Sequence, residues 1–227
     1  SESMPYIAET IRLIRDGLPA DIPLIGFGGA PFTLASYAIE GGGSRNYVFV
    51  KKLMYGDSPA WHALMEKITG ACIDYLSFQI DSGVQAVQIF DSWVGCLSPN
   101  DYREYVLPHS QRLISSISGR VPIIHFGTGN PALVSLMAEA GGDVLALDWR
   151  TPLMESWEKT GVTAVQGNLD PIILGADRAS VERKAGELLD EVGGRPGHIF
   201  NLGHGIIPET PVDNVKALVD FVHEHRA

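Results

Sequence analysis

The 227-residue sequence predicts an α/β fold, an incomplete (β/α)8 TIM barrel with about six βα units. Three observations predict it: short apolar runs recur along the chain, amphipathic stretches separate most of them, and a capping residue followed by proline marks the expected helix starts. Two parallel strands need a long crossover between them, usually a helix. The alternation therefore indicates parallel strands joined by helices.

The apolar runs are four to six residues long, which is short for a helix and typical of a buried strand. Each run is followed by Gly, Asp or Asn, and most are rich in Val and Ile. Strands that are apolar on both faces belong to parallel sheets covered by helices. The six predicted strands are Pro23–Phe27, Ala86–Phe90, Val121–Phe126, Val144–Leu147, Val162–Gln166 and His198–Leu202.

Apolar residues at a period near 3.6 predict helices between these runs. A further helix is expected at Pro5–Asp16, before the first strand, and Gly141 is expected to end the second of the periodic stretches named here. The predicted buried faces are Trp61, Leu64, Met65, Ile68, Cys72 and Tyr75; Leu133, Leu136, Met137 and Ala140; and Val215, Leu218, Val219 and Val222.

Six helix starts share one device, a capping side chain directly before a proline. The cap accepts a hydrogen bond from an unpaired N–H group, and proline at the first helical position loses none. For Asp170 this predicts a structural role. The six pairs are Ser58-Pro59, Ser98-Pro99, Asn130-Pro131, Thr151-Pro152, Asp170-Pro171 and Thr210-Pro211.

Composition limits the classes of function. With 17 basic and 27 acidic residues the net charge is −10, which is unfavourable for binding a nucleic-acid backbone. No apolar window reaches the roughly 18 residues of a membrane span, and the first residues lack the pattern of a secretory signal. Cys72 and Cys96 form no CxxC pair. We therefore expect a reduced, cytoplasmic protein that binds neither nucleic acid nor membrane.

Two architectures fit the alternation, an open doubly wound sheet and a barrel. The open sheet usually carries GxGxxG at its first turn; here GFGGAP supplies Gly26 and Gly28 but has Pro31 at the final glycine position. A barrel needs eight strands and the sequence supplies six. We therefore expect one barrel domain over residues 1–227, with two N-terminal βα units outside this sequence.

Reactive groups of a barrel lie just after the C-terminal ends of its strands. His204 lies there between two glycines, which favours a functional role, whereas His198 opens its strand and is expected to be structural. For Asp148 the sequence leaves a catalytic and a loop-holding role equally open. No HxxxH, HxC or Cys/His cluster occurs, so no metal site is predicted, and GxSxG is absent.

At these strand ends the sequence resembles the uroporphyrinogen decarboxylase family. The resemblance lies in the segments PLIGFGGAPFTLASYAIEGGGS, QIFDSWVGCLSP, HFG, LALDW, QGNLDP and FNLGHGIIPETP, in that order. It implies a (β/α)8 barrel that removes CO2 from the four acetate side chains of uroporphyrinogen III, giving coproporphyrinogen III in haem and related tetrapyrrole synthesis. It also implies no metal or organic cofactor, a homodimer, and substrate contacts from Tyr37, Ser92 and His204.

The resemblance covers roughly the C-terminal two-thirds of such an enzyme. The family's RQAGRY block and the aspartate that binds the pyrrole nitrogens lie on the first two strands, which this sequence lacks. The general acid and that aspartate are therefore unassigned here. Two alternatives stay open: a zinc-dependent corrinoid or thiol methyltransferase of related fold, and a non-catalytic binding module.

Overall fold

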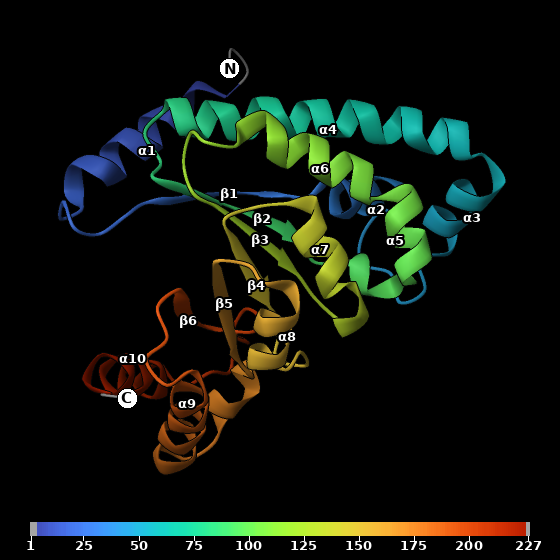
Figure 1. Ribbon diagram of the computed structural model, residues 1–227. Coiled ribbons are helices and arrows are strands. Elements are labelled where there is room, and N and C mark those ends of the chain that lie inside the picture. Colours follow the sequence, from blue (N-terminus) through green and yellow to red (C-terminus); the bar gives the residue numbers. More distant parts are fainter. Residues whose placement is uncertain (1–3, 226–227) are drawn as a thin grey trace. The chain divides into compact units, whose positions relative to one another are not determined.

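The computed structural model describes residues 4–225 and divides into two compact units, one ending at Val144 and the other beginning at Leu145 (Figure 1). In both, strands and helices alternate along the chain. The first unit contains α1 (Pro5–Gly17), β1 (Ile25–Gly29), α2 (Pro31–Glu40), α3 (Val48–Gly56), α4 (Ser58–Asp81), β2 (Ala86–Asp91), η1 (Val94–Cys96), α5 (Pro99–Tyr105), α6 (Leu107–Ile117), β3 (Ile123–Gly127), η2 (Pro131–Leu133) and α7 (Val134–Ala140).

The strand β4 (Val144–Leu147) starts at the boundary and leads into the second unit. In the first unit, the predicted helix at Pro5–Asp16 is confirmed as α1, which is one residue longer and ends at Gly17. After β4 the second unit contains α8 (Leu153–Thr160), β5 (Ala164–Leu169), η3 (Pro171–Gly175), α9 (Arg178–Val192), β6 (His198–Leu202) and α10 (Val212–Glu224).

Within each unit, strands that follow one another in the chain also pair as neighbours. β1, β2 and β3 are parallel, with Gly28 opposite Ile89 and Ile89 opposite His125. In the second unit β5 and β6 are parallel, with Gly167 opposite Phe200. A doubly wound sheet reverses its strand order at a switch point, and neither unit has such a reversal. The six βα units follow the order of an incomplete (β/α)8 barrel, as predicted.

All six predicted strands are present, and β4 and β6 have the predicted bounds. The other boundaries shift by one to three residues, and for the starts of β1 and β5 the reason is local. Pro23 has no N–H to donate, and regular pairing of β1 begins at Ile25. The carbonyl of Val162 accepts a hydrogen bond from Trp157 Nε1 of α8 at 2.9 Å, and β5 begins two residues later.

Helices cover one face of β1 and β2, whereas the sequence predicted burial on both faces. Along β2 the residues Val87, Ile89 and Asp91 are buried and alternate with partly exposed ones. On β1, Phe27 is 62% exposed. α4 and α6 lie along the same side of β1–β3 (Figure 1). The covered side of the sheet therefore carries the core of this unit.

Large side chains of α2 and α4 fill that core. Trp61 and Phe32 are fully buried, and their rings meet edge to face with centroids 6.0 Å apart. Trp61 Nε1 also donates to the carbonyl of Tyr105 at 3.0 Å, so its polar atom is satisfied. On α4 the predicted Trp61, Met65 and Cys72 are buried, while Leu64, Ile68 and Tyr75 are half-buried.

The other two predicted helix faces differ in outcome. On α7 and the turn before it, all four predicted side chains are buried, and Gly141 follows the last helical residue with a φ of 105°. On α10, Leu218 is buried but Val219 is 47% exposed. The core of the second unit is a cluster of apolar side chains from β5, η3, α9 and α10: Leu169, Leu174, Val181, Ala185 and Leu218.

Half of the predicted caps are confirmed. Ser98, Asn130 and Asp170 each accept a hydrogen bond from a backbone N–H two or three residues ahead. The prediction is wrong for the other three pairs, Ser58-Pro59, Thr151-Pro152 and Thr210-Pro211.

Each wrong pair has a local reason. Asp57, one residue before Ser58, caps α4 instead. The hydroxyl of Thr151 donates to Asp148, so it caps no helix. At the third pair, Pro211 itself occupies the cap position of α10, and it has no polar side chain to accept a hydrogen bond.

The cap of α4 gives a direct test. Asp57 Oδ1 accepts from the N–H of Ala60 at 3.0 Å. Replacing Asp57 by Ala is expected to lower the free energy of unfolding by about 1 kcal/mol, because that N–H loses its acceptor. Ser58→Ala is the matched control and should change it by less than about 0.5 kcal/mol. Urea denaturation measures both; a larger effect from Ser58→Ala would contradict the assignment.

Candidate functional site

Tyr37 and Ser92, two of the three predicted substrate contacts, lie on neighbouring segments of the first unit. Tyr37 is on α2 and is 45% exposed. Ser92 directly follows β2 and precedes Trp93. The rings of Tyr37 and Trp93 meet edge to face with centroids 5.7 Å apart. Trp93 therefore connects the segment that carries Ser92 to the helix that carries Tyr37.

A buried carboxyl group makes a second connection between β2 and α2. Asp91, the last residue of β2, is fully buried, and its Oδ1 accepts from Thr33 Oγ1 at 3.1 Å. A backbone hydrogen bond joins the same two elements, because the N–H of Ala30, directly before α2, donates to the carbonyl of Phe90 in β2 at 2.9 Å. Thr33 and Tyr37 are four residues apart and share one face of α2. Asp91 thus helps to fix the helix that presents Tyr37.

Burial raises the pKa of Asp91 to about 7, and the hydrogen bond from Thr33 opposes this only in part. Its Oδ2 has no hydrogen-bond partner among residues 4–225. A carboxyl group in such surroundings stays protonated to a pH well above its ordinary pKa. In the sequence Asp91 directly follows the predicted strand Ala86–Phe90, and nothing else there assigns it a role. The period-2 alternation with Val87 and Ile89 was the available signal.

His125 belongs to the predicted strand Val121–Phe126 and lies within β3 opposite Ile89. Its side chain is fully buried, and burial lowers its pKa to about 4. The backbone at Met137 and Gly141 acts to raise the pKa of His125, but by less than burial lowers it. A neutral imidazole packed inside the helix-covered face is a core group and no candidate for substrate contact.

In the second unit Asp148 organises the loop that follows β4. Its carboxylate is 1% exposed; Oδ2 accepts from Arg150 Nη1 at 2.7 Å, and Oδ1 accepts from the N–H of Arg150 at 3.1 Å. Thr151 Oγ1 also donates to Oδ1 at 3.1 Å. From β5, Asn168 Nδ2 donates to the carbonyls of Asp148 and Thr151 at 2.8 and 2.6 Å. The loop-holding role of Asp148 is therefore present in the structure.

The third predicted contact, His204, lies beside this loop. It follows β6 and is exposed. Its ring meets that of Trp149 edge to face, with centroids 6.0 Å apart. The guanidinium of Arg150 also lies over the Trp149 ring, with its carbon 3.8 Å from the ring centroid. We call Trp149, Arg150 and His204 the Trp149 ledge. Nothing in sequence spacing indicated that Arg150 and His204 share one tryptophan.

Gly203 allows the ledge to form. A Cβ at this position would lie 2.3 Å from the backbone nitrogen of Trp149. The N–H of Gly203 donates to the carbonyl of Leu169 at 2.7 Å, which holds the segment after β6 to the end of β5. At Gly205, on the other side of His204, a Cβ would meet nothing within 4 Å. Close packing thus requires glycine on one side of His204 only.

Two polar residues of the second unit, His198 at the start of β6 and Asp170 after β5, are structural, as predicted. His198 Nε2 lies 2.8 Å from the carbonyl oxygen of Gly167, and burial lowers the pKa of its imidazole. Asp170 Oδ1 accepts from the N–H of Ile172 at 2.9 Å and caps η3. A pocket of about 570 Å³ lies between this region and α9, lined in part by Trp149, Asn168 and Lys184. His204 is not among its lining residues.

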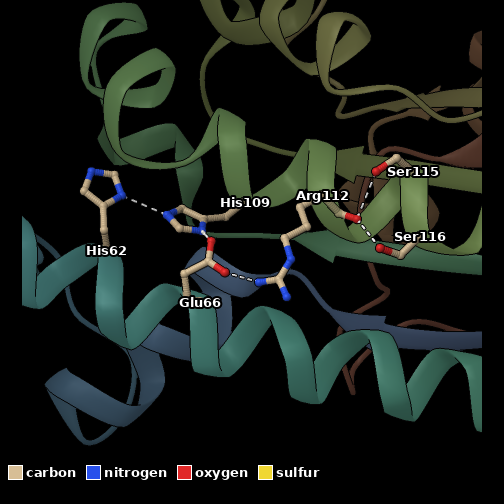
Figure 2. Close-up of polar contacts among 6 residues, drawn as sticks. All are labelled: His62, Glu66, His109, Arg112, Ser115 and Ser116. Carbon is tan, nitrogen blue, oxygen red and sulfur yellow. Dashed lines mark hydrogen bonds and ion pairs between the residues drawn. The ribbon is translucent and has the colours of Figure 1, made fainter.

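A polar cluster that the sequence did not reveal joins α4 to α6 in the first unit (Figure 2). His62 Nδ1 and His109 Nε2 are 2.9 Å apart, and His109 Nδ1 lies 3.3 Å from Glu66 Oε1. Glu66 also forms an ion pair with Arg112. Burial and the neighbouring His62 lower the pKa of His109. The cluster belongs to the helix layer, and its spacing across two helices is invisible in the sequence.

Residues 4–225 contain no group of three or more His, Cys, Asp or Glu side chains arranged to bind a metal ion. Both cysteines are free, and burial raises the pKa of the Cys72 and Cys96 thiols to about 11. Over the same residues no helix is long and apolar enough to cross a membrane.

Asp91 gives stability a specific dependence on pH. Its folded-state pKa of about 7 exceeds the ordinary 3.8, so its contribution is complete below pH 3.8 and is lost as pH rises through about 7. Asp91→Asn has no such loss. Between pH 5 and 8 the unfolding free energy of the variant should rise relative to that of the unsubstituted protein by about 3 kcal/mol. Urea denaturation at several pH values measures this, and a constant difference would refute the assignment.

The glycines beside His204 give a paired test. Gly203→Ala should lower the midpoint of thermal unfolding by several degrees, corresponding to about 2 kcal/mol, because its Cβ collides with the backbone of Trp149. Gly205→Ala should leave the midpoint nearly unchanged. Calorimetry distinguishes them, and equal midpoints for the two variants would contradict the close packing.

Residues 1–225 match the family model described as Uroporphyrinogen decarboxylase (URO-D). Curated proteins of that name are similar along nearly the whole chain. The protein from Sorangium cellulosum is 54% identical over 224 residues, covering 98% of this chain and 64% of its own length. A protein from Thermus thermophilus is 54% identical, covering 98% and 65%. The protein from Carboxydothermus hydrogenoformans is 52% identical, covering 98% and 64%.

A solved structure shares the fold. A methyltransferase from Methanosarcina mazei superposes with a TM-score of 0.84 at 25% identity, covering 97% of this chain and 64% of that one. The chain thus spans slightly less than two-thirds of the length of the relatives named here. With a family model matched from residue 1 to residue 225 and identities above 50%, this chain belongs to the uroporphyrinogen decarboxylase family.

Proposed function

We propose that the protein is a carboxy-lyase that converts uroporphyrinogen III to coproporphyrinogen III in haem and tetrapyrrole biosynthesis. The observation that carries this proposal is the identity of 54% to curated decarboxylases over 98% of the chain. The similarity spans the strand ends, where barrel enzymes hold their reactive groups, because it covers 98% of this chain.

The reaction needs three kinds of protein group. An acetate on a pyrrole loses CO2 only when the electron pair left behind has a sink, and protonation of the adjacent pyrrole carbon provides one. A second proton then converts the methylene to a methyl group, and loss of the first proton from the ring carbon restores the pyrrole. The protein must supply a general acid, an anion that stabilises the cationic ring, and partners for the remaining carboxylates.

In this proposal Tyr37, Ser92 and His204 are partners for the substrate. Tyr37 and His204 are exposed, and each rests on the ring of a tryptophan that follows a strand. Ser92 directly follows β2 and is half-buried, and its hydroxyl is proposed to donate a hydrogen bond to the substrate. A hydrogen bond from such a group to a carboxylate contributes about 1.5–3 kcal/mol when shielded from water.

The general acid and the anion are proposed to lie outside residues 1–227. The chain spans 64% of the length of its relatives from Sorangium and Carboxydothermus. We propose that it forms one barrel domain together with two further βα units that carry those groups. We also propose that the enzyme needs no metal or organic cofactor and acts as a homodimer in the cytoplasm. Sedimentation equilibrium of the complete protein tests the dimer.

A second candidate, a zinc-dependent corrinoid or thiol methyltransferase, is favoured by one observation, the TM-score of 0.84 to a methyltransferase. The cysteines fit it poorly. Thiolates bind zinc, and burial raises the pKa of the Cys96 thiol to about 11. Cys72 lies on α4, its Sγ donates to the carbonyl of Gly29 at 3.6 Å, and burial raises the pKa of its thiol to about 11 as well. One zinc ion per chain in the purified protein would favour the methyltransferase.

The decisive experiment supplies the complete gene product with uroporphyrinogen III prepared without oxygen. Products are oxidised to porphyrins and separated by chromatography. Accumulation of coproporphyrin, with intermediates that have lost one to three carboxyl groups, supports the proposal. Unchanged uroporphyrin with an enzyme shown to be folded would refute it.

His204→Ala in the complete protein is expected to lower kcat/KM by about tenfold or more, the effect of losing one charge-assisted hydrogen bond to a carboxylate. His223→Ala, on the last turn of α10, is the control and should change it little. The same chromatographic assay measures both variants. An unchanged kcat/KM for His204→Ala in all four decarboxylations would remove His204 from the site.

A further inference from the structure

Arg150 is fixed more firmly than an exposed arginine normally is. Its Nη1 donates to Asp148 Oδ2 at 2.7 Å, and its backbone N–H donates to Oδ1 of the same carboxylate at 3.1 Å. The guanidinium carbon lies 3.8 Å from the centroid of the Trp149 ring. An ion pair along one edge and an aromatic ring against one face together restrict both the position and the plane of the group.

The ion pair leaves much of the guanidinium available. Arg150 offers five N–H donors in a rigid fork, and Asp148 uses the Nη1 side. Its Nε and Nη2 have no hydrogen-bond partner within residues 4–225, and the side chain is 48% exposed. The buried carboxylate orients the fork while its other edge faces water.

The neighbour of Arg150 across the tryptophan is His204. The rings of Trp149 and His204 meet edge to face at 6.0 Å, so the imidazole and the guanidinium contact one indole. Gly203 keeps them there, because the backbone of Trp149 occupies the space of its missing Cβ. A cationic fork and a histidine are therefore presented together at the ends of β4 and β6.

We propose that Arg150 binds a substrate carboxylate on the Trp149 ledge, beside the carboxylate that His204 contacts. The inference rests on the proposed function, because it takes the acetate and propionate groups of a porphyrinogen as the ligand. The planar fork matches a carboxylate in two parallel hydrogen bonds. It also places a fixed positive charge in a chain of net charge −10, which otherwise repels a polyanionic substrate.

A purely structural role for Arg150 makes a different prediction. The carboxylate of Asp148 is 1% exposed, and a buried charge without its partner destabilises the fold. Removing Arg150 alone therefore changes stability in either case. The double variant Asp148→Asn/Arg150→Met leaves neither charge behind and keeps an amide oxygen for Thr151. The double variant therefore distinguishes an Arg150 that only neutralises Asp148 from an Arg150 that also binds a ligand.

The test measures the binding of uroporphyrin, the oxidised and unreactive form, to the complete protein by fluorescence titration. Arg150→Gln and the double variant are compared with Arg183→Gln. That control removes an exposed arginine of α9, paired with Glu187, without touching the ledge. Thermal unfolding midpoints are recorded for every variant.

We expect both ledge variants to bind uroporphyrin at least tenfold more weakly, even where the double variant regains the unfolding midpoint of the unsubstituted protein. Arg183→Gln should stay within twofold. Unchanged affinity in Arg150→Gln, or recovery of affinity together with stability in the double variant, would overturn the proposal. Because binding needs no turnover, weaker binding in a protein that forms no coproporphyrinogen would sustain the Arg150 site and reject the decarboxylase function.

Discussion

Parallel strand pairing is the constraint on which the rest of this structure depends. Each parallel neighbour needs a helical crossover, so every strand ends at the same edge as the strand it pairs with. In the first unit this brings the end of β2 against the start of α2, and in the second it brings the end of β6 beside the loop after β4. Residues far apart in the chain, such as Trp149 and His204, become neighbours for this reason.

Asp91 and Asp148 are buried at these strand ends, where a carboxylate loses the solvation of its charge. The two residues meet this cost in opposite ways. Among the described residues Asp91 has no cation beside it, and burial raises its pKa to about 7, so it keeps its proton up to about that pH. Asp148 remains a hydrogen-bond acceptor for Arg150 and Thr151 and keeps a cation at its side. The first arrangement fixes a helix by a hydrogen bond. The second also orients a charged group toward solvent, which is why only the second yields a binding proposal.

Aromatic side chains carry the predicted substrate contacts in both units. Tyr37 rests on Trp93, and His204 rests on Trp149, each in an edge-to-face arrangement. Such contacts restrict a side chain without using its polar atoms. The side chains of Tyr37 and His204 are therefore oriented by packing against indole rings, which suits the proposed contacts with the carboxylates of a porphyrinogen.

The sequence alone determined the six strands, the parallel α/β class, the caps at Ser98, Asn130 and Asp170, and the family, because these depend on local periodicity, local hydrogen bonds and contiguous motifs. It did not determine that Asp57 rather than Ser58 caps α4, that His125 is a buried core group, or that His62 and Glu66 meet His109 and Arg112. It also gave Arg150 no neighbour across Trp149. These features arise where two elements pack together, and the spacing of residues along one chain does not encode which faces meet.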